Sequence, residues 1–207
     1  MKGVIAVEYK SRSVKLSLPN GCVVDILSEV LGSMYRWRQD DFCSLESCGF
    51  VLGYMNTDTK NVTLSSLTTP QHNTFNSRVF CKLQTFVHLR QLKENERHKN
   101  YYMGTWHTHP QSIPFPSPTD WKDWRETLEK DTTGCEFAFF VIIGIDEFRV
   151  WAGNLRSKEI IELHEVPMTD GIYGKGDIKK CELNGCISLI SILIIAIMIQ
   201  NCYEKTS

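Results

Sequence analysis

Two histidines and an aspartate lie close together in the sequence and have side chains that bind metals. His107 and His109 are separated by one residue, and Asp120 follows after a proline-rich loop. On an extended strand, residues i and i+2 point to the same face, so the two imidazoles can converge on one ion. Pro110 ends such a strand directly after the second histidine. Two imidazoles and one carboxylate form a known catalytic zinc site with a position left for water. The sequence therefore predicts one Zn²⁺ ion held by His107, His109 and Asp120.

The same segment also has the features of an ordinary helix start. Ser117 followed by Pro118 is typical of an N-cap with proline at the first helical position. Asp120 would then lie in the first turn, where its carboxylate stabilises backbone N–H groups and the helix dipole. That interpretation explains Ser117 and Asp120 without a metal, and a His-x-His pair can equally be two surface histidines. Only the combination of these features at one spacing favours the metal site.

The combination resembles the JAMM (MPN-plus) metalloprotease motif. That motif reads His-[Ser/Thr]-His-Pro, six residues, then Ser-x-x-Asp, and residues 107–120 match each defined position. The family also has an upstream segment of the form Glu-x-Gly-Gly-x-Leu-x-Gly, and ESCGFVLG at residues 46–53 occupies that place. Its glutamate is Glu46, whereas Cys48 replaces the first glycine and Val51 replaces the leucine. The resemblance covers roughly residues 20–155.

The resemblance implies a zinc-dependent peptidase or isopeptidase on an MPN/JAB fold, which is similar to the fold of cytidine deaminases. Glu46 would take a proton from the attacking water and pass it to the leaving amine. The Ser117 hydroxyl would donate a hydrogen bond to the oxyanion of the tetrahedral intermediate. The same hydroxyl is the predicted helix cap, so one role must use its lone pair and the other its proton.

Within this family, further features resemble small bacterial deconjugases. These features are the tryptophan before the histidine pair, the proline-rich loop, and Trp121 and Trp124 in the following helix. Such enzymes occur in antiphage CBASS operons, where they release a nucleotidyltransferase that was joined to a target through its C-terminus. The resemblance implies such a conjugate, or a ubiquitin-like one, as the substrate. Two alternatives stay open: a processing peptidase for a sulfur-carrier-like protein, and a non-catalytic MPN scaffold, although scaffold relatives lack the metal ligands present here.

Hydrophobic patterns predict the elements that position these residues. Strands are expected at residues 13–18, 48–54, 62–67, 101–106, 137–143 and 148–151. Helices are expected at residues 23–37 with Asn20 as cap, at residues 118–130, and after Asn76. The apolar face of the helix after Asn76 is expected to comprise Val79, Phe80, Leu83, Phe86 and Val87. This mixed order predicts the α/β (α+β) class, with a mixed central sheet flanked by helices.

Length and composition are those of one globular domain with an appendage. The chain has 207 residues and a formal net charge of -1, with no basic run, so nucleic acid is not an expected partner. We expect a JAMM/JAB domain at residues 1–167, a linker at 168–186, a hydrophobic segment at 187–199 and a tail at 200–207. Because a bilayer span needs about 20 apolar residues, the hydrophobic segment is either a membrane anchor or an element buried against the domain.

The cysteines predict little chemistry of their own. The chain has eight, and no C-x-x-C pair occurs, so a cysteine zinc site is not expected. The N-terminus lacks the long apolar region of a secretory signal. We therefore expect a cytoplasmic protein with reduced thiols, most of them small core residues, and with membrane contact only through residues 187–199.

Overall fold

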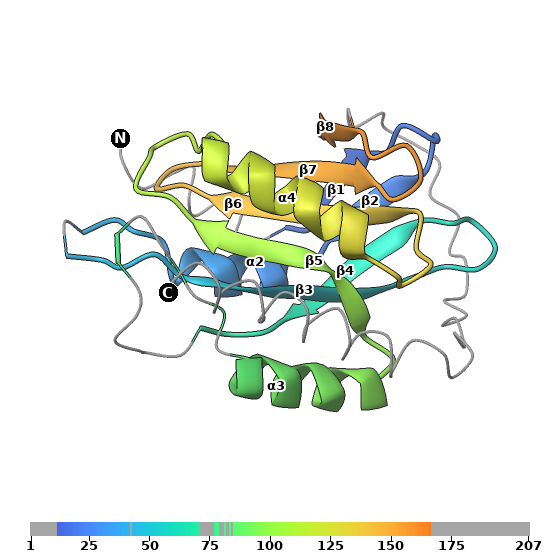
Figure 1. Ribbon diagram of the computed structural model, residues 1–207, viewed down its shortest axis with the longest axis horizontal. Coiled ribbons are helices and arrows are strands. Elements are labelled where there is room, and N and C mark those ends of the chain that lie inside the picture. Colours follow the sequence, from blue (N-terminus) through green and yellow to red (C-terminus); the bar gives the residue numbers. More distant parts are fainter. Residues whose placement is uncertain are drawn as a thin grey trace.

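The computed structural model describes residues 12–41, 43–70, 77–78, 81, 83 and 85–166. Within these ranges the chain forms one eight-stranded sheet in the order β1-β2-β4-β3-β5-β6-β7-β8, with helices packed against it (Figure 1). The strands are β1 (Val14–Ser17), β2 (Val23–Ile26), β3 (Cys48–Met55), β4 (Val62–Leu67), β5 (Tyr101–Thr108), β6 (Phe137–Ile143), β7 (Phe148–Asn154) and β8 (Ile160–Glu162). The helices are α2 (Ser28–Tyr35), α3 (Thr85–Arg97) and α4 (Pro118–Lys130).

The sheet contains both parallel and antiparallel pairs. β2 runs parallel to β4 and β5 runs parallel to β6, whereas the other neighbouring strands are antiparallel. The predicted mixed central sheet flanked by helices is therefore confirmed. β5 lies between β3 and β6, so the histidine pair follows a central strand whose backbone is hydrogen-bonded on both sides.

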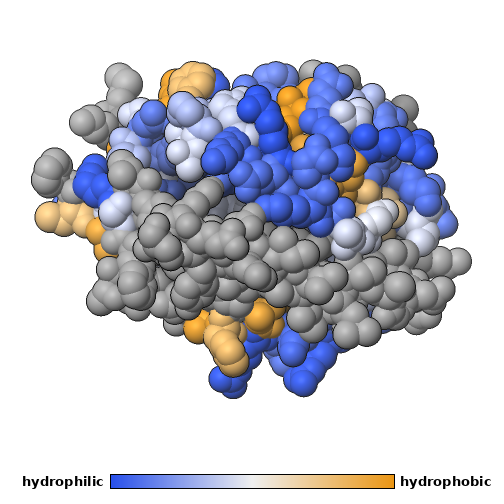
Figure 2. Space-filling view, viewed as in Figure 1, coloured by the Kyte–Doolittle hydropathy of each residue, from blue (hydrophilic) through white to orange (hydrophobic). Residues whose placement is uncertain are grey.

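Both faces of β6 are buried, which explains its continuous apolar sequence. Phe140 and Ile142 pack with Trp124 of α4. Phe139 and Val141 point the other way and join the main core, to which α2 contributes. α4 and α2 therefore cover opposite faces of the sheet. The outward side of the molecule that carries α4 is mostly hydrophilic, as expected for a helix whose other side is buried (Figure 2).

The predicted helix at residues 23–37 is wrong in its first part. Residues Val23–Ile26 form β2, which pairs with β1 and β4, and the helix covers only Ser28–Tyr35. The first part is rich in β-branched residues and has a strand partner on each side, so sheet pairing prevails over the local helical pattern. Asn20 therefore caps no helix. Its side chain accepts a hydrogen bond from the Cys22 N–H at 3.0 Å, in the turn between β1 and β2.

The second predicted helix begins later than expected. α3 starts at Thr85, and Phe86, which was expected in the core, is 90% exposed. The buried face of α3 contains His88 and Leu92, which contact the cluster around Phe50 of β3. Leu83, also expected in the core, precedes the helix and is partly buried against the same cluster, so the expected apolar face is confirmed for Leu83 and wrong for Phe86. Asn76, Val79 and Phe80 lie outside the described residues.

The C-terminal end of the described chain adds a strand that the hydrophobic pattern did not predict. β8 pairs antiparallel with β7 and is only three residues long, too short to show a period. Residue 166 is the last one described. The predicted boundary at residue 167, the linker at 168–186, the hydrophobic segment at 187–199 and the tail at 200–207 thus lie outside the described residues and stay predictions. Across the described ranges, no helix has the length and apolar character to cross a membrane.

His88 is a buried histidine on α3, away from the histidine pair. It is 2% exposed, its Nδ1 lies 2.7 Å from Thr68 Oγ1, and its ring contacts Phe50 edge-on. Burial lowers the pKa of His88 from 6.5 to about 4. The unfolded chain therefore binds a proton below pH 6.5 that the folded chain does not bind until about pH 4.

We expect His88 to make the protein less stable in acid. Its contribution to the free energy of unfolding is complete above pH 6.5 and is lost as the pH falls from 6.5 to about 4, by a total of about 3 kcal/mol. Urea unfolding at pH 7 and pH 4.5 measures this loss in the wild type and in His88→Gln, whose side chain does not titrate. His98→Gln is the matched control, because His98 is an exposed histidine directly after the C-terminal end of α3. Equal losses in the wild type and His88→Gln would contradict the prediction.

Candidate metal and catalytic site

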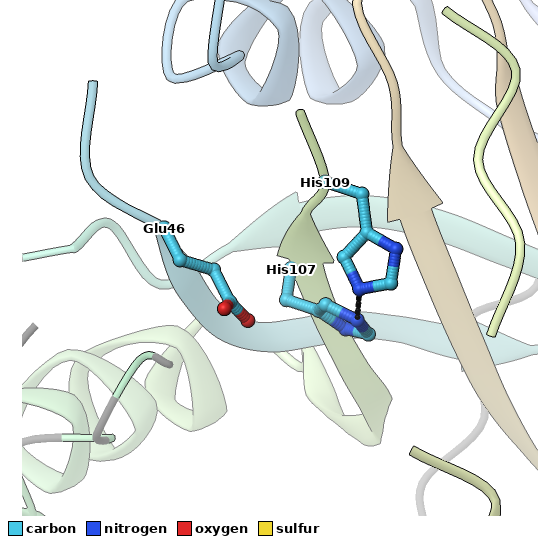
Figure 3. A group of neighbouring side chains, drawn as sticks. All are labelled: Glu46, His107 and His109. Atoms are coloured by element: carbon cyan, nitrogen blue, oxygen red, sulfur yellow. Dashed lines mark hydrogen bonds between the residues drawn. The ribbon is translucent and has the colours of Figure 1, made fainter. Parts of the chain in front are cut away.

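The two histidines lie at the end of β5 and face the same point. His107 is in the strand, and His109 continues the strand geometry, because its N–H donates to the Ile143 carbonyl at 2.9 Å. The Nε2 atoms of the two imidazoles are 3.1 Å apart (Figure 3). Thr108 between them is fully buried on the opposite side of the chain. The strand alternation that the sequence predicted thus brings both imidazoles together.

Asp120 reaches the histidine pair from the first turn of α4. A capping box holds this turn: the Asp120 N–H donates to Ser117 Oγ at 3.2 Å, and the Ser117 N–H donates to Asp120 Oδ2 at 2.6 Å. Asp120 Oδ1 lies 3.2 Å from His107 Nε2, and Asp120 Oδ2 lies 3.4 Å from His109 Nε2. The helix-start interpretation and the site interpretation are therefore compatible, because the cap itself directs the carboxylate at the imidazoles.

Glu46 approaches from the other side, just before β3. Its backbone N–H donates to the Ser77 carbonyl at 2.7 Å. Residue 48 of β3 pairs with His107 of β5, which places Glu46 beside the end of the histidine strand. One carboxylate oxygen of Glu46 and the facing nitrogens of His107 and His109 all lie within 4.8 Å of one another. In Figure 3 the Glu46 carboxylate is turned toward the two rings.

Burial and neighbouring charges shift the pKa values of Glu46, His109 and Asp120. Burial raises the pKa of Glu46 to about 7, although the two histidines act in the opposite direction. Burial would also raise the pKa of Asp120, but hydrogen bonds from His107 and His109 outweigh it and lower this pKa. Burial would lower the pKa of His109, and the hydrogen bond to Asp120 reverses the effect and raises it. Asp120 is thus held as a carboxylate, whereas Glu46 can gain or lose a proton near neutral pH.

The distances among the candidate ligand atoms fit a zinc ion. Bond lengths of about 2.0–2.1 Å in a tetrahedral site imply distances of about 3.3–3.4 Å between neighbouring ligand atoms. The observed separations are 3.1 Å between the imidazoles, 3.2 Å from His107 to Asp120 and 3.4 Å from His109 to Asp120. The distances to Asp120 involve two different oxygens, Oδ1 for His107 and Oδ2 for His109. Glu46 is the other carboxylate within reach of the pair, so both Asp120 and Glu46 are candidates for the third ligand.

All five residues predicted for the site line one cleft of about 600 Å³. Residues of β3, β5 and α4 also line this cleft. Arg78, Cys81 and Leu83 complete the lining from the segment before α3. The cleft is therefore bounded by segments far apart in the sequence, with the candidate zinc ligands and Glu46 along it.

A disulfide bond lies in the wall of this cleft. Cys48 at the start of β3 is bonded to Cys81, with their Cα atoms 6.0 Å apart. The expectation of reduced thiols is therefore wrong for this pair, because the fold brings together two residues that are 33 positions apart. Cys22, Cys43 and Cys135 are free, and Cys43 is exposed, so it is not a core residue.

Three residues around the site were missed in the sequence. Arg78 and Cys81 line the cleft, and Gln39 is buried behind it. Gln39 and Arg78 stand in no motif and at no regular spacing from the histidines. Cys81 is one of eight cysteines, and its separation of 33 positions from Cys48 does not mark the two as partners. Their places depend on how the segments around residues 39 and 78 fold back onto β3 and β5.

The comparison with known proteins agrees with the motif. The family described as prokaryotic homologs of the JAB domain matches residues 27–154, and the chain belongs to this family. The chain is similar to a CD-NTase/cGAS isopeptidase of Vibrio cholerae serotype O1 (strain ATCC 39315 / El Tor Inaba N16961), with 28% identity over 145 residues, or 68% of this chain and 86% of that protein. It is also 28% identical over 143 residues to a CD-NTase/cGAS isopeptidase of Escherichia coli (strain TW11681), again over 68% and 86% of the two chains. The predicted family and fold class are confirmed.

Proposed function

We propose that this chain is a JAMM-type zinc isopeptidase that releases a CD-NTase, or a ubiquitin-like protein, from a conjugate, in the cytoplasm and in antiphage defence. The observation that carries the proposal is the convergence of His107, His109 and Asp120 at mutual distances of 3.1, 3.2 and 3.4 Å, with Glu46 beside them. Both relatives are named as CD-NTase/cGAS isopeptidases, which supports this substrate class.

In this proposal, each residue of the cleft has a distinct task. His107, His109 and Asp120 would hold the zinc ion, which polarises the scissile carbonyl and lowers the pKa of water. Glu46, whose pKa burial raises to about 7, accepts the proton of the attacking water and delivers it to the leaving amine. The Ser117 hydroxyl holds the Asp120 N–H with a lone pair and directs its proton to the developing oxyanion.

The lining of the cleft includes residues of α4 beyond the candidate metal site. The cleft has a volume of about 600 Å³, and Trp124 and Thr127 of α4 line it together with the two histidines. An extended C-terminal tail of the joined protein can lie in this cleft, with its last carbonyl at the histidine pair. The lysine-containing target then occupies the opening, where the leaving amine departs.

We expect the full chain, loaded with zinc, to cleave a lysine-linked conjugate of a CD-NTase C-terminus. The test compares this branched substrate with a linear substrate, in which the same C-terminus carries a peptide extension. We expect kcat/KM to be at least about tenfold higher for the branched substrate, because the longer lysine arm places the amine differently at the site.

The alternatives predict other results in the same assay. A preference for the linear substrate would indicate processing of a carrier protein instead of deconjugation. A protein that binds one zinc ion and cleaves neither substrate nor a ubiquitin-like conjugate would be a binding module, and the proposal would fail.

A further inference from the structure

A buried glutamine joins three segments behind the site. Gln39 is 1% exposed. Its Oε1 accepts a hydrogen bond from the Thr108 hydroxyl at 3.1 Å. Its Nε2 donates to the carbonyl of Ser44 at 3.3 Å and to the carbonyl of Arg78 at 2.9 Å. The amide thus uses its oxygen and both N–H groups on three different parts of the chain.

The bond to Thr108 links Gln39 to the histidine strand and to Glu46 at once. Thr108 is fully buried, and its hydroxyl also accepts a hydrogen bond from the Ser47 N–H at 3.0 Å. The Thr108 N–H in turn donates to the Ser47 carbonyl at 2.9 Å. Because Thr108 lies between the two histidines and Ser47 follows Glu46, these bonds set the distance between Glu46 and the imidazoles.

The other two bonds of Gln39 hold Glu46 from its N-terminal side. Ser44 lies two positions before Glu46 in the chain. Arg78 follows Ser77, whose carbonyl accepts the Glu46 N–H at 2.7 Å. Two segments that contact the backbone around Glu46, at Ser44 and at Ser77–Arg78, are therefore tied to the same amide.

The candidate metal ligands are held by other contacts. His107 and His109 are fixed by the pairing of β5 with β6 and by the His109 N–H bond to Ile143. Asp120 is fixed by the capping box of α4. Disturbing Gln39 therefore displaces Glu46 while the zinc ligands keep their own supports.

We propose that Gln39 is a positioning residue that fixes Glu46 against the histidine pair; this rests on the proposed function. An apolar side chain of similar size would remove the acceptor of the Thr108 hydroxyl proton and the amide that donates to the carbonyls of Ser44 and Arg78. The segment around Glu46 then moves to satisfy them. A misplacement of about 1 Å of a catalytic group costs on the order of 100-fold in rate.

The test is Gln39→Met in the full chain. We expect kcat for the conjugate to fall about 10- to 100-fold, with KM within about threefold of the wild type and one zinc ion per chain retained. Gln91→Met is the matched control, since Gln91 also bridges backbone groups, at Thr69, and neither residue lines the cleft. It is expected to lose stability without losing kcat. Wild-type kcat in Gln39→Met, or a loss that follows zinc content, would overturn the proposal.

A second pair of variants tests the same link without touching Gln39. Thr108→Val removes the hydroxyl, and Thr108→Ser keeps it. We expect Thr108→Val to lose kcat as Gln39→Met does and Thr108→Ser to lose much less; equal losses would overturn the proposal even if Gln39→Met does not fold.

In Glu46→Gln, adding Gln39→Met should cause no further loss of the residual rate. Failure of the wild type to cleave any conjugate would refute the proposed function instead.

Discussion

Alanine at His107 or His109 is expected to abolish zinc binding and hydrolysis together. Each change removes one of three candidate ligands, and the remaining two groups bind zinc weakly. We expect zinc content to fall from one ion per chain to nearly zero after dialysis, and kcat/KM to fall by at least about 1000-fold. Metal analysis and the conjugate assay measure the two quantities separately. His98→Ala, at an exposed histidine directly after α3, is the control.

Asp120→Asn is the sharper version of this experiment. An asparagine oxygen can still accept the Ser117 N–H, so the helix cap is kept while the negative ligand is lost. We expect the same loss of zinc with little change in the thermal unfolding of the metal-free protein. Full zinc content in Asp120→Asn would show that another carboxylate completes the site, and Glu46 is the other one within reach of the pair.

Removing the metal from the wild type should also lower its stability. A ligand that binds only the folded state stabilises it by RT ln(1 + [L]/Kd), which is about 4 kcal/mol at 1000 times Kd. We therefore expect a chelator to lower the unfolding temperature and zinc to restore it. The same treatment should leave the unfolding temperature of His107→Ala unchanged. A chelator-induced shift of equal size in that variant would place the bound metal elsewhere.

Glu46→Gln is expected to have the largest effect on turnover without loss of zinc. Glutamine has the size of glutamate but cannot carry a proton from water to the leaving amine. We expect kcat to fall about 100- to 10,000-fold, with KM and zinc content unchanged. Steady-state kinetics and metal analysis on one preparation measure both. Glu159→Gln, at an exposed position next to β8, is the matched control.

Two results would contradict this role of Glu46. Retained turnover in Glu46→Gln would remove Glu46 from the proton transfer. Loss of zinc in Glu46→Gln, with zinc retained in Asp120→Asn, would exchange the roles of the two carboxylates. The first assignment is the one we propose; the two oxygens of Asp120 lie 3.2 and 3.4 Å from the two histidine nitrogens, one oxygen for each histidine.

Local chemistry made several elements predictable from the sequence. α4 begins and ends where predicted, at Pro118–Lys130, because a serine cap and a proline mark its start. β6 coincides with the predicted strand at residues 137–143, because a strand buried on both faces is an unbroken apolar run. The grouping of His107, His109 and Asp120 was likewise predictable, since strand alternation and a helix cap act over a few residues. For these features the determining interactions lie within the segment itself.

Other features were decided only by the tertiary structure. β2 is a strand because β1 and β4 lie on either side of it, and no local pattern distinguished it from the start of a helix. The Cys48–Cys81 disulfide and the bonds of Gln39 join residues whose separation in the chain gives no signal. These residues meet only when the distant segments that carry them pack together in the folded chain. The sequence by itself determined which side chains could do chemistry here, and the folded chain decided what surrounds and orients them, because those contacts are made between distant segments.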